Sequence, residues 1–356
     1  MKEPEIIAEI GVNYYDVSGK LGIGLVDAAK EMILRCKNSG IKTVKFQTYK
    51  AEKIAAEYSP SYWDLNEEPT RSQKELFSKF DKFGESEYKE LADYCKVNGV
   101  EFMSTPFDIE SADFIDQLVS RHKIASADIT NLQLLKKIAD FGKPVILSTG
   151  ASKQEEVTEA VDILERFGCN DITLLHCVLS YPTAQKDANL WKIRALLKQF
   201  PDLRVGLSDH STFSLDVLIA AWLLGVEVIE KHFTLDKALR GNDHYHAADP
   251  QDFIKLQDKI KLLKEIYGNE RTDWLFKCEE EAYINARRGV YLNIDVKKSD
   301  KLRIEHLSFL RPQLSGLSPK QVMDCIENES VYTDYFKKGK LLTEDAVYKL
   351  ANKSLY

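Results

Sequence analysis

The amino-acid sequence predicts an α/β fold, a (β/α)₈ TIM barrel followed by a smaller second domain. Three observations lead to this prediction. Short apolar runs alternate with amphipathic stretches of helical period, the alternation occurs eight times, and it fills about 265 residues, close to the roughly 250 typical of such barrels. Alternation of this kind implies parallel strands, because parallel neighbours need crossover connections. A doubly wound open sheet is the competing arrangement. No GxGxxG motif follows the first predicted strand, which weakens the dinucleotide-binding version of that fold.

Each predicted strand is a short apolar run, and several are preceded by a turn that contains glycine. We expect helices that include residues 25–37, 86–96, 153–167 and 214–224. Ser86 is the expected N-cap of the second of these helices and Gly99 its C-terminal stop. The expected strands are residues 6–10, 43–47, 101–104, 123–126, 145–148, 172–176, 204–208 and 227–231.

The alternation ends near Tyr267. We therefore expect the barrel to occupy residues 1–270, a charged linker or loose helix residues 271–285, and a second domain residues 286–356. This domain of about 70 residues has the pattern of short strands and turns, and domains so small bury little core and often dock on a neighbour.

Composition narrows the class of protein. With 49 Lys and Arg against 56 Asp and Glu, the net charge is −7, so neither nucleic acid nor an anionic membrane surface is an expected partner. The N-terminus has no signal-peptide pattern, and no apolar run approaches the roughly 20 residues that cross a bilayer. The six cysteines form no close pair, which is typical of reduced thiols. We expect a soluble, cytoplasmic enzyme.

Polar residues that packing does not require gather where the predicted strands end. The active site of a (β/α)₈ barrel lies at the C-terminal ends of its strands. We expect Lys45 and Lys123, with serine hydroxyls around them, to bind a phosphate and a carboxylate of one small molecule. The candidates at or just after strand ends are Glu9, Lys45, Gln47, Thr105, Lys123, Ser126, Asp128, Ser148, His176, Ser208, His210, Glu230, His232 and Asp243.

Two of these histidines are candidate metal ligands. His210 and His232 close the neighbouring strands seven and eight, so their imidazoles can converge, and Glu9 closes the next strand around the barrel. Two imidazoles with a carboxylate or water suit a labile divalent metal such as Mn²⁺ or Mg²⁺, and zinc is also compatible with these ligand types. His244 and His246 also follow the last strand, so five of the seven histidines gather at strand ends, but the polar loop that carries these two is equally compatible with simple exposure.

Ten short segments of the predicted barrel form a distinctive set. They are residues 8–13 (AEIGVN), 45–48 (KFQT), 104–108 (STPFD), 123–126 (KIAS), 147–150 (LSTG), 175–177 (LHC), 181–183 (YPT), 206–210 (GLSDH), 230–234 (EKHFT) and 241–244 (GNDH). Taken together, these segments resemble the sialic acid synthase family, which includes the legionaminic and pseudaminic acid synthases. The small domain resembles that family's C-terminal antifreeze-like (SAF) module, through residues 290–300 and 307–312.

The resemblance implies a synthase that joins phosphoenolpyruvate to an N-acylated hexosamine aldehyde, such as N-acetylmannosamine, to give a nonulosonic (sialic-type) acid and phosphate. It implies a domain-swapped homodimer and a divalent metal, Mn²⁺ or Mg²⁺, held by His210 and His232. By the same resemblance, phosphoenolpyruvate would be bound by Lys45, Thr105, Lys123, Ser126, Ser148 and Ser208. The sugar would meet Glu9, Gln47, Tyr181, Asp243 and, from the partner chain, Arg311. Glu9, Asp128 and Glu230 are the candidates to activate water.

Three positions depart from the family's pattern, namely Tyr14, Leu179 and Ala247; we place the first and third near the sugar. The acceptor therefore stays open among N-acetylmannosamine, its 6-phosphate and a di-N-acetylated dideoxyhexose leading to legionaminic or pseudaminic acid. Two other activities are weighed against the synthase: a Schiff-base pyruvate lyase with Lys123 as nucleophile, and a non-enzymatic sugar-acid sensor. The long connection of residues 49–84 is either a lid or dimer contact, or a packed insertion.

Overall fold

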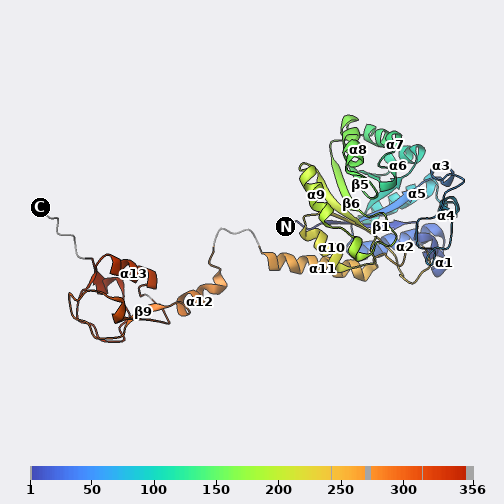
Figure 1. Ribbon diagram of the computed structural model, residues 1–356. Coiled ribbons are helices and arrows are strands. Elements are labelled where there is room, and N and C mark those ends of the chain that lie inside the picture. The colour runs from blue at the N-terminus through green and yellow to red at the C-terminus, as the bar shows by residue number, and fades with distance from the viewer. Residues whose placement is uncertain (1, 242, 269–273, 315, 350–356) are drawn as a thin grey trace. The chain divides into compact units, whose positions relative to one another are not determined.

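The computed structural model describes residues 2–241, 243–268, 274–314 and 316–349 of the chain. The chain forms two compact units, Met1–Gly268 and Asn269–Tyr356, which are coloured blue to yellow-orange and orange to red in Figure 1. The expected boundary between residues 270 and 271 lies outside the described residues.

The first unit contains a parallel eight-stranded sheet whose ladder runs β3-β2-β1-β8-β7-β6-β5-β4. The two end strands, β3 and β4, contact each other, so the sheet curls into a barrel, and the predicted fold class is confirmed. All eight expected strands are present within two residues of their predicted ends. They are β1 (Glu5–Gly11), β2 (Thr43–Thr48), β3 (Glu101–Pro106), β4 (His122–Ile124), β5 (Val145–Ser148), β6 (Ile172–Cys177), β7 (Arg204–Asp209) and β8 (Val228–His232).

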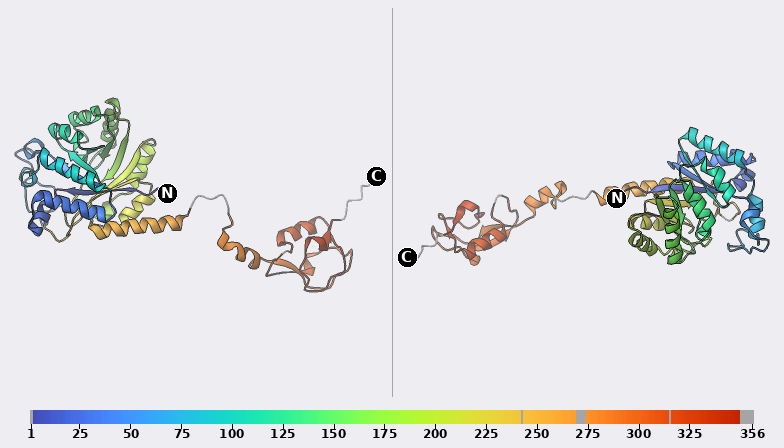
Figure 2. Two further views of the ribbon diagram at one scale, coloured as in Figure 1. Left: turned by 180° about the vertical axis from the view of Figure 1, so that it is seen from behind. Right: turned by 90° about the horizontal axis from the view of Figure 1, so that it is seen from above.

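Helices cover the outside of the barrel (Figure 2), and for this reason nearly every strand residue is buried. One expected cap is wrong: α5 begins at Glu85, and the side chain of Glu87 accepts a hydrogen bond from the backbone N–H of the capping residue Gly84 at 2.8 Å. Its C-cap is Gly99, whose φ of 68° is the left-handed conformation that glycine favours. The helices of this unit are α1 (Tyr14–Leu21), α2 (Leu25–Asn38), α3 (Ala51–Ile54), α4 (Gln73–Phe80), α5 (Glu85–Asn98), α6 (Ile109–Asp116), α7 (Leu132–Asp140), α8 (Gln154–Arg166), α9 (Trp191–Gln199), α10 (Leu215–Leu223) and α11 (Pro250–Tyr267).

The interior of the barrel is divided into layers. Near the N-terminal ends of the strands, Arg121 binds the carboxylates of Glu5 and Glu101 and so links the first residues of β1 and β3 to the start of β4. An apolar layer of Ile7, Met103, Ile146, Leu175 and Val228 follows. These two layers fill the barrel from one end, and the polar residues of the strand ends therefore meet at the other.

The connection of residues 49–84 is a packed insertion with its own apolar cluster. Trp63, Leu76 and Phe80 are buried in that cluster together with Val12 and Tyr49, and α3 and α4 are its regular elements. Some of its side chains also line the pocket described below, so the insertion forms part of the wall of the site.

The second unit is built from short strands and turns, as expected, around a small core that includes Val290, Val322 and Leu342. Its strands form two antiparallel pairs, β9 (Gly289–Leu292) with β10 (Leu307–Leu310) and β11 (Val331–Tyr332) with β12 (Val347–Tyr348). The sequence analysis missed the helix α13 (Pro319–Glu327). A second helix, α12 (Glu280–Asn285), lies in the expected linker.

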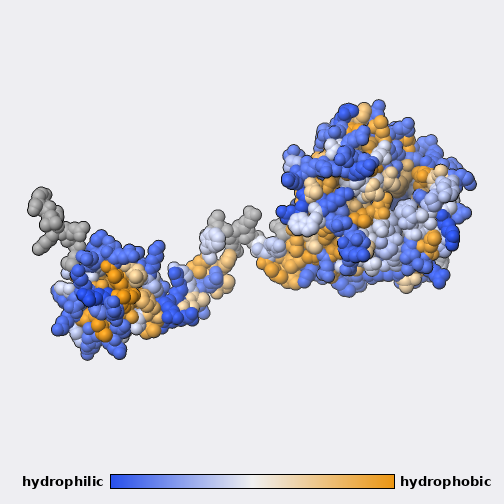
Figure 3. All heavy atoms as spheres, viewed as in Figure 1, coloured by the Kyte–Doolittle hydropathy of each residue, from blue (hydrophilic) through white to orange (hydrophobic). Residues whose placement is uncertain are grey.

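Hydrophilic residues predominate on the visible surface of each unit (Figure 3). Of the helices in the described part of the chain, none combines the length and apolar character needed to cross a membrane.

Candidate active site

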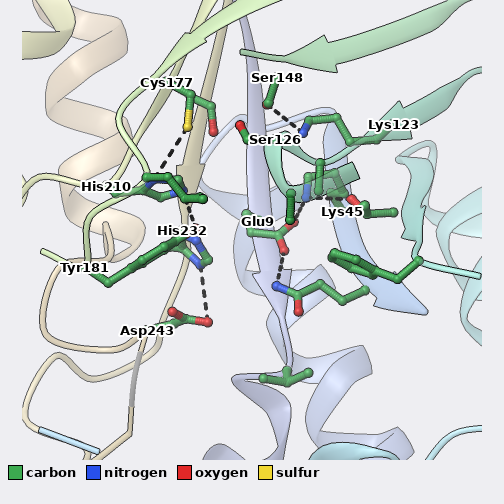
Figure 4. Close-up of a pocket in the computed structure, with 18 of the residues that line it drawn as sticks. Glu9, Lys45, Lys123, Ser126, Ser148, Cys177, Tyr181, His210, His232 and Asp243 are labelled. Carbon is green, nitrogen blue, oxygen red and sulfur yellow. Dashed lines mark hydrogen bonds and ion pairs between the residues drawn. The ribbon is translucent and has the colours of Figure 1, made fainter. Parts of the chain in front are cut away.

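One pocket lies at the C-terminal ends of the barrel strands, and it brings together most of the residues that the sequence singled out (Figure 4). Every strand of the barrel, or the turn that follows it, contributes at least one side chain to its lining. The predicted residues that line it are Glu9, Lys45, Gln47, Thr105, Lys123, Ser126, Ser148, Tyr181, Ser208, His210, Glu230, His232 and Asp243.

Two candidates of the first unit, Asp128 and His176, do not line this pocket, and Nε2 of His176 lies 2.7 Å from the backbone carbonyl oxygen of Ala188. The carboxylate of Asp128 accepts a hydrogen bond from Asn131 at 3.1 Å, and Asp128 is outside the lining, so the structure does not bring it to the other candidates. Arg311 is an exposed residue of the second unit. Its role in sugar binding stays a prediction.

Lys45 lies among carboxylates and a hydroxyl. Its ammonium group pairs with Glu9, lies 3.8 Å from Oε2 of Glu230 and donates to Oγ1 of Thr105 at 3.2 Å. The side chain is 5% exposed, so its charge is neutralised by these partners and not by water. Gln47 donates to the other oxygen of Glu9 at 3.0 Å, and this bond fixes the orientation of the Glu9 carboxylate.

Lys123 is the second buried cation. It donates to Oγ of Ser148 at 2.8 Å and lies 3.8 Å from Oε1 of Glu230, which in turn accepts a hydrogen bond from Ser208 at 2.9 Å. Ser126 accepts a hydrogen bond from the backbone N–H of Gly150 at 2.8 Å, which leaves its own proton free to donate. The two lysines and the hydroxyls thus surround the carboxylate of Glu230.

The two central carboxyl groups have opposite pKa shifts. Burial raises the pKa of Glu9, and the nearby Glu230 adds to this effect although Lys45 opposes it. Burial would also raise the pKa of Glu230, but Lys123, Lys45 and the Ser208 hydroxyl outweigh it and hold that pKa below its usual value. Burial lowers the pKa of Lys123. The surroundings therefore favour the ionised form of Glu230, whereas burial favours the protonated form of Glu9.

His210 has its ring fixed from two sides. Its Nδ1 lies 3.0 Å from the backbone carbonyl oxygen of Val178 and its Nε2 lies 3.2 Å from the hydroxyl of Tyr181. A proton on Nδ1 donated to the carbonyl leaves the lone pair on Nε2, which is the arrangement that metal-binding histidines use. The ring of Tyr181 packs on this imidazole with centroids 4.3 Å apart.

His232 lies beside His210, with ring centroids 5.5 Å apart. Its Nδ1 is buried and has no hydrogen-bond partner among the described residues; the nearest charged atom is Oδ2 of Asp243 at 3.8 Å. Burial, with Glu9 nearby, raises the pKa of Asp243 to about 7. The carboxylate beside the imidazole pair is thus Asp243, whereas the sequence pointed to Glu9, which instead pairs with Lys45.

These observations test whether the histidine pair fits a divalent metal. One imidazole, that of His210, has its tautomer set by a backbone carbonyl, and the other, that of His232, has a buried and unpartnered nitrogen with a carboxylate oxygen 3.8 Å away. Imidazole and carboxylate donors in this number suit first-row divalent ions. The residues present therefore fit the group that the sequence analysis expected.

Sequence reasoning missed several parts of the site. His244 and His246 were grouped with the strand-end histidines but given no role, with simple exposure as the alternative, and both are fully buried. For residues 49–84, which form part of the pocket wall, the sequence did not decide between a lid or dimer contact and a packed insertion. The composition of the loop carried a signal for burial, because Ala247 and Ala248 directly follow His246. The apolar and aromatic lining residues that were not predicted are Val12, Tyr49, Tyr62, Leu76, Phe77, Phe80, Phe107 and Leu179.

Two of the departures from the family's pattern do not affect the pocket as expected. Tyr14 is buried and stacks on Phe83 with ring centroids 4.3 Å apart, and neither Tyr14 nor Ala247 lines the pocket. Leu179 does line it. Asn242, which belongs to one of the matching segments, lies outside the described residues.

Comparison with known proteins supports the same assignment. The NeuB family matches residues 32–272. An N,N'-diacetyllegionaminic acid synthase of Campylobacter jejuni is 34% identical over 97% of this chain and 100% of its own length. An uncharacterised protein of Methanocaldococcus jannaschii is 38% identical over 92% of this chain and 90% of its own length. The solved structure of the N-acetylneuraminic acid synthetase of Leptospira borgpetersenii, in complex with citrate, superposes with a TM-score of 0.66 at 30% identity, covering 79% of this chain and 90% of that one. The chain therefore belongs to the NeuB family, and the resemblance to the sialic acid synthases is confirmed.

Proposed function

We propose that this protein condenses phosphoenolpyruvate with an N-acylated amino-sugar aldehyde and water, giving a nonulosonic acid and phosphate. The observation that carries the proposal is that one pocket joins two buried lysines with hydroxyl donors to a cluster of imidazoles beside a carboxylate. Membership of the NeuB family supports the same reaction class.

Phosphoenolpyruvate is assigned to the lysine side of the pocket. Its phosphate and carboxylate need several donors and fixed cations, and Lys45, Lys123, Thr105, Ser126, Ser148 and Ser208 supply these groups. Both lysines are already oriented by carboxylates and hydroxyls. A pre-oriented cation loses little conformational freedom on binding, so the site holds the two anionic groups in fixed positions.

The imidazole side is assigned to the divalent metal and the sugar aldehyde. His210 and His232 would hold Mn²⁺ or Mg²⁺, with Asp243 beside them. A bound cation supplies Lewis-acid polarisation of the aldehyde oxygen, which the weakly nucleophilic C3 of phosphoenolpyruvate requires. Gln47, which bonds Glu9, and Tyr181, which packs on His210, are the proposed contacts of the sugar.

The proton transfers that the reaction requires give roles to Glu9 and Glu230. Attack of C3 on the aldehyde makes the new C–C bond and leaves positive charge at C2, water adds there, and the C2–O bond to phosphate then breaks. The water loses two protons: the former aldehyde oxygen gains one and the departing phosphate gains the other. We assign the proton transfer to the aldehyde oxygen to Glu9, whose protonated form is favoured by burial, and assign to Glu230 the permanent charge that orients the lysines and favours the cationic C2.

The composition of the pocket wall favours an acceptor without phosphate. Among the described lining residues, Lys45 and Lys123 are the only lysines and there is no arginine, and both lysines are engaged at the other end. A phosphorylated sugar would need another cation, which the pocket wall of this chain's own barrel does not supply and which only Arg311 of the proposed partner chain could add. The remaining wall is apolar, with Phe77 and Phe80 among its members. We propose that the acceptor is a di-N-acetylated deoxyhexose, whose methyl groups can pack on this wall.

We also propose the homodimer that the resemblance implies. Its support is the exposure of apolar side chains near the junction of the two units: Trp274 is 97% exposed, and Leu275, Phe276, Tyr283 and Ile284 are each about half exposed. Such a patch is typical of a surface that another chain covers. A mixture of Lys123→Ala and Arg311→Ala chains tests the exchange of domains. In a swapped dimer one site of each mixed dimer is intact, so random mixing restores about a quarter of the wild-type sites. If each site uses its own chain alone, mixing restores nothing.

A Schiff-base lyase is the second candidate, because the lowered pKa of Lys123 would suit an amine nucleophile. Reduction with borohydride in the presence of pyruvate would then leave a covalent adduct on Lys123. The synthase proposal expects no mass shift on this peptide.

The direct test of the proposed function is mass spectrometry of the product. Purified protein is supplied with phosphoenolpyruvate, Mn²⁺ and one acceptor at a time: N-acetylmannosamine, its 6-phosphate or a di-N-acetylated deoxyhexose. We expect a product whose mass equals acceptor plus phosphoenolpyruvate plus water minus phosphoric acid, formed fastest with the last acceptor. Absence of that mass with every acceptor would reject the synthase activity and leave the sugar-acid sensor.

A further inference from the structure

His246 is a buried imidazole without a structural role that the described residues can explain. It lies in the loop after β8, is 0% exposed, and neither of its ring nitrogens has a hydrogen-bond partner among the residues that the structure describes. A buried polar group normally finds a partner, because leaving it unpaired costs stability. A side chain in this state points to a ligand that completes it.

The neighbouring histidine of the same loop shows the contrast. His244 is equally buried, but its Nδ1 lies 2.7 Å from Oγ1 of Thr234 and its Nε2 lies 3.3 Å from Oδ2 of Asp16. These bonds tie this part of the loop to its own first residues after β8 and to α1. The loop is thus held by His244, and His246 is available for another function.

One of the unpartnered nitrogens of His246 faces the candidate metal residues. Its Nε2 lies 3.9 Å from Oδ1 of Asp243, and the other oxygen of that carboxylate lies 3.8 Å from Nδ1 of His232. One ligand atom from each of the three residues lies within 4.8 Å of the other two. Donor atoms bound to one ion at about 2.1 Å are roughly 3 to 3.5 Å apart, so a small contraction would bring all three into coordination. The separations are too long for direct hydrogen bonds.

The ring positions agree with a single centre. The centroids of His232 and His246 are 5.0 Å apart, those of His210 and His232 are 5.5 Å apart, and those of His210 and His246 are 6.4 Å apart. Imidazoles that share one ion through nitrogens about 2.1 Å away have centroids roughly 5 Å apart. The distances from His232 to the other two rings match this value, and the longer distance between His210 and His246 requires one of those two rings to shift when the ion binds.

We propose that His246 is a third imidazole ligand of the divalent metal, completing a cluster with His210, His232 and the carboxylate of Asp243. The inference rests on the proposed function, because it concerns the same cation. A third nitrogen donor would also determine which divalent metal the site prefers. Three nitrogen donors favour ions such as Mn²⁺, Co²⁺ or Zn²⁺, whereas Mg²⁺ takes oxygen ligands and keeps several waters.

The test measures metal binding directly and not only turnover. Wild-type protein and the variants His246→Asn and His246→Gln are freed of metal by chelation, and their folding is checked by circular dichroism. Calorimetric titration with Mn²⁺, and separately with Mg²⁺, gives the affinities. Pulsed electron paramagnetic resonance of the Mn²⁺ complexes counts the imidazole nitrogens coupled to the ion. His122→Asn is the matched control, because His122 is also buried with one unpartnered nitrogen but lies at the start of β4 and binds Asp116.

We expect both His246 variants to lose one coupled nitrogen and to bind Mn²⁺ roughly 10- to 100-fold more weakly, with a smaller change for Mg²⁺, while His122→Asn matches the wild type. Equal Mn²⁺ affinity and an equal nitrogen count in a folded His246 variant would overturn the third ligand and leave the proposed function standing. Wild-type protein that binds no Mn²⁺ at all would overturn both this inference and the metal role of His210 and His232.

Discussion

The ammonium group of Lys123 lies 3.8 Å from Oε1 of Glu230, and both side chains are buried at the C-terminal end of the barrel. The second oxygen of the same carboxylate lies 3.8 Å from Nζ of Lys45. One glutamate therefore sets the separation of two buried cations. A substrate with two anionic groups finds both cations already in place, and this arrangement is the basis of the predictions that follow.

Replacing Lys123 by Met removes one of these cations and leaves Glu230 with Lys45 as its remaining cationic neighbour. We expect kcat/KM for phosphoenolpyruvate to fall about 100- to 1,000-fold, the size of effect found when one fixed donor to a reacting group is lost. Lys143→Met is the control, because Lys143 pairs with Asp116, outside the pocket lining. Steady-state phosphate release measures both variants. A loss of less than threefold in Lys123→Met would remove this lysine from the binding site of phosphoenolpyruvate.

The apolar wall makes a prediction about acceptor choice. Phe77→Arg places a cation among the aromatic side chains of the wall, where the wild-type lining offers none that is free. We expect kcat/KM for the di-N-acetylated acceptor to fall about tenfold and the relative use of a sugar 6-phosphate to rise, since phosphate is recognised by arginine. Phe77→Leu, which keeps the wall apolar, should change neither value by more than about twofold. An unaltered acceptor ratio in Phe77→Arg would show that this wall does not contact the distal end of the sugar.

The closure of the barrel depends on Arg121. It directly precedes β4 and donates to Glu5 of β1 at 2.8 Å and to Glu101 of β3 at 2.7 Å. It therefore joins β4 to β3, the strand at the other end of the hydrogen-bonded ladder, and to β1. Arg121→Met leaves two partly buried carboxylates without their cation. We expect the free energy of unfolding at pH 7 to fall by about 1–3 kcal/mol.

The pH dependence of this loss has a defined sign. Burial opposes ionisation of Glu5, but Arg121 outweighs it and lowers the pKa of Glu5 below the model-compound value of 4.5. The stabilisation is therefore complete above pH 4.5 and disappears as the pH falls through the lower folded-state pKa. Urea unfolding of the two proteins at pH 7 and at acid pH should show midpoints that differ at pH 7 and converge on acidification. The exposed pair of Arg204 with Asp171 provides the control, and Arg204→Met should change stability by no more than about 0.5 kcal/mol. A penalty that grows as the pH falls would contradict the role given to Arg121.

The fold was predictable because its signals are local. An apolar strand followed by an amphipathic helix is visible in any short window of the sequence, and the barrel then follows from repetition and from the crossover rule. The residues at strand ends were predictable for the same reason, since the topology alone carries Lys45, Lys123 and Glu230 to one edge of the sheet. The helix α13 was missed because its nine residues lie among turns and short strands in a small unit.

The parts of the site that were not predictable depend on loops and on burial. His246 and Asp243 belong to a polar loop whose path cannot be derived from periodicity, so the sequence could not show that both face His232. Asp128 illustrates the opposite error: it follows a strand end, but the backbone turns after Ser126 and its carboxylate bonds Asn131 instead of entering the pocket. Asp128 lies four residues beyond the end of β4, so its side chain is positioned by the turn and no longer by the sheet.

The most direct measurement of the central claim is phosphate release by chelated and by metal-loaded enzyme under otherwise equal conditions. Protein treated with EDTA and then dialysed is assayed with phosphoenolpyruvate and a di-N-acetylated acceptor, first without metal and then with Mn²⁺ added back. The account predicts that phosphate appears only when both substrates and the metal are present, and that Mn²⁺ restores the rate of the untreated enzyme. An unchanged rate in protein shown to be free of metal, or phosphate release that does not need the acceptor, would contradict it.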